Sequence, residues 1–246
     1  MALTSRRGVL ALLLGAGLAA GTARAAGGDG WNSLWIWADQ ERASVNEFRY
    51  FRGRFRLGKA PARAPLRITA DTSYQLLVNG KQVGRGPEAS YPARKSYDTW
   101  ELAPLLGAGD NTIAVMAYHC GVETVSAPLG RAGLLAQVDW VEDGVQRSFG
   151  TGEDWKTAPA DAWARDAARL NPGAGFLEVC DLAKAPVGWA AGEFDDSGWP
   201  TADAVGSPPQ APWTDLVPRA LPHRKEASIP PVRVASRGTI PRHGVM

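Results

Sequence analysis

The chain is 246 residues long, enough for one large domain with a sizeable buried core, and its 45% hydrophobic and 21% charged residues are ordinary for a globular protein. The first 25 residues contain three arginines and no acidic residue, so without them 24 of the 27 basic residues stand against 25 acidic ones. This near balance excludes the strongly basic surface with which proteins bind nucleic acid or anionic membranes.

The N-terminal residues carry the marks of an export signal. Arg6 and Arg7 directly precede an apolar run that ends at Ala20, and Ala23-Arg24-Ala25 fits a cleavage site. The run is shorter than the about 20 apolar residues that span a bilayer. We therefore predict that residues 1–25 are a signal peptide of the twin-arginine type, with an ordinary Sec signal as the alternative. The mature protein is expected to be periplasmic or secreted, with no membrane span.

The first predicted strands follow from residues that alternate between apolar and polar. The segment 51–57 places arginines between apolar residues, which is the period of a half-buried strand. We expect Arg52, Arg54 and Arg56 to form one solvated row on its outer face. Leu66, Ile68 and Ala70 indicate a second strand in the same way.

Two further pairs of apolar runs predict hairpins. Asn79-Gly80 separates the runs 74–78 and 81–83, and Asp143-Gly144 separates the runs 134–141 and 145–149. Such dipeptides favour the type I′ turn, because both of its central residues need a positive φ. With a strand over 113–118, these runs predict an all-β protein built as an antiparallel sandwich of the jelly-roll type.

The remaining segments predict little regular structure. Residues 161–170 predict one short amphipathic helix capped by Asp161. From Gly206 onward the sequence is rich in proline, and Val232 to Val234 indicate the start of another strand. We therefore divide the chain into a signal peptide (1–25), a β-sandwich domain (26–205), and a proline-rich linker with the start of a further domain (206–246).

Several stretches, in this order, resemble the N-terminal sandwich domain of bacterial α-L-rhamnosidases. They include Trp35-Ile36-Trp37, the segment 68–80 with its Asn-Gly turn, Gly150-Thr151-Gly152-Glu153-Asp154-Trp155-Lys156 after a hairpin, and Phe194-Asp195-Asp196-Ser197-Gly198-Trp199. The resemblance spans residues 31–222 and implies a galactose-binding-like fold.

The resemblance also carries an expectation about activity. In the resembled enzymes, catalysis belongs to a helical α/α-barrel that follows the β domains, and only 24 residues follow Pro222 here (246 − 222). The chain is therefore expected to lack the catalytic domain and its catalytic residues. It is interpreted as a non-catalytic accessory or carbohydrate-binding-like module of an exported α-L-rhamnosidase-type glycoside hydrolase, as a truncated N-terminal part. The alternatives are a free-standing exported carbohydrate-binding protein and a broken gene product without a function of its own.

Two constellations contain residue types used in catalysis, but turn and strand geometry weigh against a catalytic role for them. Glycoside hydrolysis needs two carboxyl groups that face one sugar, and Glu178 with Asp181 or Asp195 with Asp196 are the candidates. Neighbours on a strand point to opposite faces, so we interpret Asp195-Asp196 as turn residues, with a calcium site as the alternative. His119 and Cys120 are adjacent too, and the same argument weighs against a His-activated thiolate.

No spacing of histidines and cysteines in the sequence fits a zinc site, and no other cofactor motif is present. Cys120 and Cys180 either form a disulfide, which an exported chain permits, or remain two inert thiols.

The candidate binding residues lie in predicted loops at one end of the sandwich. Loops carry binding in β scaffolds because they vary without disturbing the sheet. The segment 85–100 is polar and rich in rings, and the turn after residue 118 adds two polar side chains. The partner is either a glycan or the catalytic domain of a glycoside hydrolase. The candidates are Arg85, Glu88, Tyr91, Tyr97, Asp98, His119 and Glu123.

Overall fold

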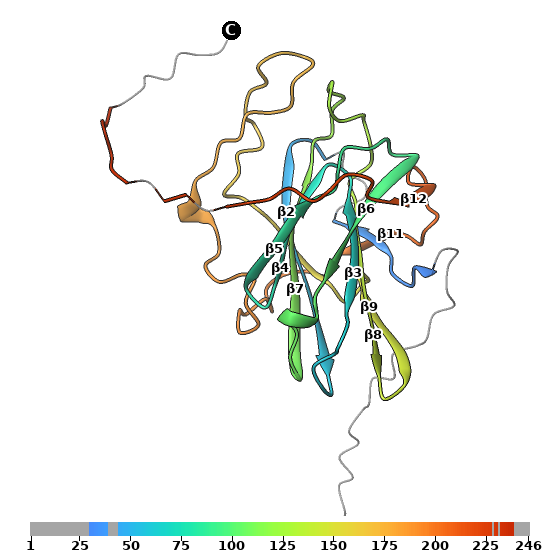
Figure 1. Ribbon diagram of the computed structural model, residues 1–246. Helices are drawn as coiled ribbons and strands as arrows, with labels where there is room; N and C mark the ends of the chain where they lie inside the picture. The colour runs from blue at the N-terminus through green and yellow to red at the C-terminus, as the bar shows by residue number, and fades with distance from the viewer. Residues whose placement is uncertain (1–29, 39–43, 228, 231, 239–246) are drawn as a thin grey trace, which may run out of the picture.

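The computed structural model describes residues 30–38, 44–227, 229–230 and 232–238, and it shows two β-sheets packed face to face (Figure 1). The predicted signal peptide, residues 1–25, lies outside the described residues. Two short 3₁₀ helices, η2 (Ala103–Leu105) and η3 (Leu182–Lys184), join the strands. The strands are β1 (Trp35–Trp37), β2 (Glu47–Leu57), β3 (Pro65–Ala70), β4 (Ser73–Val78), β5 (Lys81–Gly86), β6 (Arg94–Glu101), β7 (Gly109–His119), β8 (Leu134–Glu142), β9 (Val145–Gly150), β10 (Lys156–Pro159), β11 (Asp203–Gly206) and β12 (Asp215–Pro218).

The two sheets have seven and five strands. The larger has the order β11-β1-β8-β3-β6-β12, with β9 paired to β8, and the smaller has the order β10-β2-β7-β4-β5. The described strand pairs are antiparallel apart from β12 and β6, which run parallel. The predicted all-β sandwich is confirmed.

Both predicted hairpins are confirmed at their turns. Asn79 and Gly80 have φ values of 49° and 79°, and Asp143 and Gly144 have values of 50° and 77°. Positive φ at both central residues is the mark of the type I′ turn, whose twist matches that of the flanking strands. These turns set the registers of β4 with β5 and of β8 with β9.

The main core lies between the sheets. Alternate residues of the strands point inward, so each strand contributes apolar side chains at every second position. Fully buried members of this core include Ile36, Phe51, Leu66, Ile68, Leu76, Val78, Ile113, Val115, Leu134, Val138 and Trp155.

Within the described part of the chain, no helix is long and apolar enough to cross a membrane.

The arginine row predicted along residues 52–56 is wrong at its first member. Arg54 and Arg56 are exposed, whereas Arg52 is only 1% exposed. Its Nε donates to Asp196 Oδ2 at 2.7 Å. The cause is the segment 160–200, which covers this part of the outer face of β2 and supplies a carboxylate to the guanidinium.

The predicted helix over residues 161–170 is also wrong. The segment forms one arm of a two-armed ribbon, residues 160–181, whose arms are joined by the Trp163–Cys180 and Arg169–Phe176 bridges. The backbone groups bond across the ribbon, as from Ala164 N–H to Val179 O at 2.9 Å, and not four residues back along a helix. Sequence periodicity cannot show this competing partner.

The sandwich continues beyond residue 205, where its end was predicted. Trp213 is fully buried and stacks on Trp35, with ring centroids 3.8 Å apart. The strand β12 then adds to the edge of β6. Together with Trp31 and Leu135, the two tryptophans form a second apolar cluster on the outer face of the larger sheet. Val232 to Val234, predicted to begin a strand, form none.

Candidate functional site

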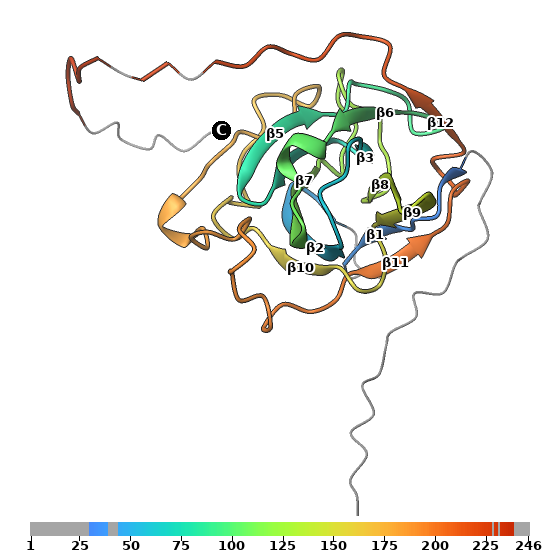
Figure 2. The same ribbon diagram turned by 60° about the horizontal axis from the view of Figure 1, so that its bottom comes forward.

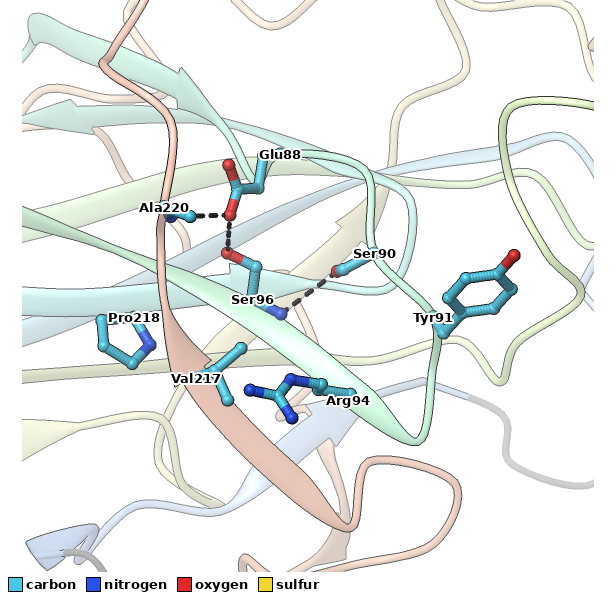
Figure 3. Close-up of a pocket in the computed structure, with 8 residues that line it drawn as sticks. All are labelled: Glu88, Ser90, Tyr91, Arg94, Ser96, Val217, Pro218 and Ala220. Carbon is cyan, nitrogen blue, oxygen red and sulfur yellow. Dashed lines mark hydrogen bonds between the residues drawn. The ribbon is translucent and has the colours of Figure 1, made fainter.

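A surface pocket of 460 Å³ lies where the loop between β5 and β6 faces β12 (Figure 3). Its floor is made by β6 and β12, whose parallel pairing brings residues 94–97 beside residues 215–218. The lining combines hydroxyl, carboxylate, guanidinium and phenol groups with apolar surface. The lining residues are Glu88, Ser90, Tyr91, Arg94, Ser96, Val217, Pro218 and Ala220.

Glu88 holds the two sides of the pocket together. Its Oε1 accepts the hydroxyl of Ser96 at 2.8 Å and the N–H of Ala220 at 2.9 Å, and its Oε2 accepts the N–H of Leu221 at 3.0 Å. Burial raises the pKa of Glu88, but these three hydrogen bonds and the charge of Arg219 outweigh it, so the pKa is lowered. The carboxylate is therefore ionised, and it secures the segment after β12 to the loop.

Arg94 and Tyr91 present the groups that remain open to solvent. The guanidinium of Arg94 is 74% exposed and lies 3.9 Å from Asp215, a loose surface pair. Tyr91 is also 74% exposed, and its ring stands at the outer end of the loop, apart from Glu88 and Ser96 (Figure 3). A phenol, a guanidinium and hydroxyl groups on one pocket rim are groups that can contact a polar ligand.

Two other predicted residues lie near the pocket on strands. Arg85 is exposed on β5 and lies 3.8 Å from Glu226. Tyr97 points to the outer face of β6, where its ring meets Trp31 edge-on with centroids 5.5 Å apart. The segment 85–100, predicted as a loop, is therefore a loop only between β5 and β6.

Asp98 is fully buried and serves the core. Its carboxylate accepts hydrogen bonds from the hydroxyl of Tyr74 and from Nε of Arg219. Tyr74 in turn accepts the indole N–H of Trp100 at 2.9 Å. Burial, followed by the charge of Asp98, raises the pKa of Tyr74. This network leaves Asp98 no free face for a ligand.

His119 and Glu123 lie outside the residues that line the pocket. His119 is buried, with Nδ1 2.7 Å from the Asp71 carboxylate. The backbone carbonyl of Glu123 accepts Nη2 of Arg169 at 3.3 Å. The structure therefore separates the seven predicted residues, and only Glu88 and Tyr91 line the pocket.

The carboxylates weighed for catalysis have structural partners. Asp196 pairs with Arg52 and Arg54, and Asp195 accepts the N–H of Ser197 at 2.9 Å, as in a turn. Glu178 accepts the indole N–H of Trp163 at 2.9 Å. Among the residues that the structure describes, no three histidine, cysteine or acidic side chains gather where a metal ion could bind.

The two cysteines are free thiols, Cys120 buried and Cys180 exposed. Burial, followed by the charges of Glu178 and Asp181, raises the pKa of Cys180. A raised pKa is the opposite of what activates a thiolate.

Sequence reasoning missed the contribution of β12. Val217, Pro218 and Ala220 fall in the predicted linker because prolines surround them, yet they line the pocket. Ser90, Arg94 and Ser96 were passed over because no pattern marks them. The one available signal was the apolar pair Leu216-Val217 after Trp213, which is short for a strand.

Comparison with known proteins links most of the chain to one family. A sequence model described as the Alpha-L-rhamnosidase N-terminal domain matches residues 59–220. A curated Alpha-L-rhamnosidase from Streptomyces avermitilis is 31% identical over 170 residues, which are 64% of this chain and 15% of that protein.

Solved structures share the fold. The GH78 family rhamnosidase of Bacillus sp. GL1 is 41% identical with a TM-score of 0.71, over 78% of this chain and 20% of that one. A lectin from Pleurotus ostreatus, solved in complex with GalNAc, is 22% identical with a TM-score of 0.53, over 75% of this chain and 46% of the lectin. At that identity the lectin shows the fold alone. The chain thus spans a fifth or less of these two rhamnosidases.

Proposed function

The chain belongs to the α-L-rhamnosidase N-terminal domain family, and from this membership we propose that it is a non-catalytic accessory module of an α-L-rhamnosidase-type glycoside hydrolase. The observation that carries the proposal is the match to a rhamnosidase at 41% identity over only 20% of that chain. A region of that size corresponds to one domain of a larger enzyme. We further propose that the module is exported, on the basis of Arg6, Arg7 and the apolar run after them.

The state of the carboxyl groups supports a non-catalytic role. A general acid in a glycosidase needs a raised pKa to keep its proton. Of the carboxyl groups weighed for catalysis, Asp195 has a lowered pKa instead, because it accepts hydrogen bonds from Ser197.

Carbohydrate binding at the pocket is the second candidate. It is supported by the exposed phenol of Tyr91, the guanidinium of Arg94 and the hydroxyl of Ser90, which all belong to the lining. The pocket is an open surface depression with both apolar and polar lining, which suits weak binding of a ligand.

The accessory role is tested with a chimera. Residues 30–246 replace the homologous region of the Bacillus sp. GL1 rhamnosidase, and hydrolysis of an aryl α-L-rhamnoside is measured for the chimera and for this chain alone. We expect turnover by the chimera and none by the chain alone. Turnover by the chain alone that disappears in Glu178→Ala would contradict the proposal, and so would a chimera that does not fold.

The binding candidate needs a separate titration. L-rhamnose and rhamnose-containing oligosaccharides are added to the chain at millimolar concentration while backbone amide shifts are followed. Binding predicts shifts at residues 88–96 that Tyr91→Ala and Arg94→Ala both remove, whereas Arg63→Ala, beside the far end of β6, leaves them. Unchanged amide shifts at residues 88–96 would rule out binding at the pocket and leave the accessory role as the sole proposed function.

A further inference from the structure

The ribbon, residues 160–181, stands out from the sandwich at one end together with the loop 121–131 (Figure 1). Its base is fixed to β2. Asn46 Nδ2 donates to the carbonyls of Ala164 and Arg165 at 3.1 Å, and Arg165 Nη2 lies 3.4 Å from the Glu47 carboxylate. The ribbon is therefore held in place at its base, although its outer part has no core beneath it.

Arg169 holds the outer part in shape. Its guanidinium donates to the carbonyls of Ala174 at 2.8 Å, of Glu123 at 3.3 Å and of Pro172. Its Cζ also lies 5.7 Å from the centre of the Phe176 ring. One side chain thus connects three carbonyls on two segments and fixes the conformation of the tip.

The loop and the ribbon join at their tips. Val125 N–H donates to Gly173 O at 3.0 Å, which aligns the two segments. Several of the side chains that this arrangement exposes are apolar. Val125 is 93% exposed, Leu170 is 74% exposed and Leu177 is 39% exposed. Apolar side chains gathered on a rigid projection mark an interaction surface, because a preorganised surface loses little entropy on binding.

We propose that this tip surface, made of Val125, Leu170 and Leu177, docks onto the part of an α-L-rhamnosidase-type enzyme that follows the N-terminal domain. The inference rests on the proposed accessory function. It adds which face of the module is the interface and what chemistry the partner offers, namely an apolar protein surface.

The course of the C-terminal segment argues for this occupant over a second copy or a sugar. After β12 the chain crosses β6 and β5. The His223 ring packs at a tilt against Trp100 with centroids 3.9 Å apart, and the Glu226 carboxylate accepts a hydrogen bond from Gln82 at 2.9 Å. In both views it then leaves the sandwich on the side where η3 follows the ribbon (Figure 1 and Figure 2). Leu182 and Val187 on this side are 72% and 94% exposed. A domain joined to this segment would therefore meet the side that carries η3 and the ribbon.

Hydrogen exchange gives a direct test. Amide exchange is compared between the full chain alone and the chimera with the Bacillus sp. GL1 rhamnosidase. We expect exchange in residues 121–131 and 160–181 to slow at least about tenfold in the chimera, a change that corresponds to about 1.4 kcal/mol of local protection. The β8–β9 hairpin, residues 141–147, serves as the control and should exchange equally in both.

Variants provide an independent readout. The double variant Val125→Ser/Leu170→Ser should lower the thermal midpoint of the chimera by several degrees and leave that of the chain alone unchanged. The matched control is Val141→Ser/Val145→Ser, two exposed valines of the hairpin, which should change neither.

The outcomes separate the two proposals. An active chimera with no slowing at the tip overturns this inference and leaves the accessory function standing. An inactive or unfolded chimera counts against the accessory function itself. If the chain alone forms a dimer that the double variant abolishes, the occupant is a second copy and the proposed partner is wrong.

Discussion

Arg52 Nε and Asp196 Oδ2 lie 2.7 Å apart, although 144 positions separate them in the sequence. The arginine side chain has no exposed surface and the carboxylate is 10% exposed. The pair therefore connects β2 to the segment that covers its outer face. Asp196 also lies 3.0 Å from Nη2 of the exposed Arg54, so one carboxylate pairs with two arginines of one strand.

Removing Asp196 should destabilise the fold strongly. Asp196→Ala leaves the buried guanidinium of Arg52 without its counter-charge, which costs about 3–5 kcal/mol. The neighbouring Asp195→Ala is the control, because that carboxylate only caps a turn at the surface, and we expect it to change stability by less than about 1 kcal/mol. Urea denaturation of both variants measures the difference, and equal losses would contradict this role of the ion pair.

The same reasoning applies to the C-terminal segment. Arg219→Ala leaves the fully buried carboxylate of Asp98 with only the hydroxyl of Tyr74, and a loss of about 3–5 kcal/mol is expected. Arg63→Ala is the matched control, since the side chain of Arg63 is 83% exposed and lies 3.8 Å from Glu101. Loss of such a surface ion pair lowers the free energy of unfolding by about 0–1 kcal/mol. Unfolding midpoints in guanidinium chloride decide between them. A negligible effect of Arg219→Ala would show that the segment after β12 is dispensable.

Gly53 is needed where β2 passes Trp155. A Cβ at this position would lie 2.3 Å from Cε2 of the fully buried indole, so Gly53→Ala forces the core apart. Overpacking of this kind costs about 1–3 kcal/mol. Gly198→Ala, where a Cβ meets nothing within 4 Å, is the control and should change little. Differential scanning calorimetry compares the two, and matching midpoints would refute the close approach.

The sequence predicted those features that depend on neighbouring residues. The alternation along residues 51–57 and the Asn79-Gly80 turn are local, so the strands and hairpins followed from them. The burial of Arg52 did not follow, because it depends on a carboxylate far along the chain, and the ribbon did not follow, because its arms bond to each other. Glu88 was singled out for its charge in a loop, but its role as a clamp depends on the N–H groups of residues 220 and 221.

Protonation of Glu88 at acidic pH should weaken its hydrogen bonds to residues 220 and 221. The pKa of Glu88 is lowered in the folded state, so the unfolded chain binds the proton more readily, and stability falls as the pH drops below about 4.3. The contribution is expected to be under about 1 kcal/mol because the group is near the surface. Glu88→Gln should flatten the fall in stability between neutral and acidic pH, as measured by urea titrations at several pH values. Parallel curves for the variant and the wild type would assign the acid response to other groups such as Glu47.

The late position of Trp213 and Arg219 has a consequence for biosynthesis. Trp213 completes a cluster begun by Trp35, and Arg219 neutralises a carboxylate on β6, so the N-terminal half emerges from the ribosome with both sites open. Pairings this distant form slowly and keep strand edges unpaired meanwhile. We therefore expect the nascent chain to stay incompletely folded until residues 213–219 have left the ribosome, and a chain cut off before residue 213 to be more sensitive to protease.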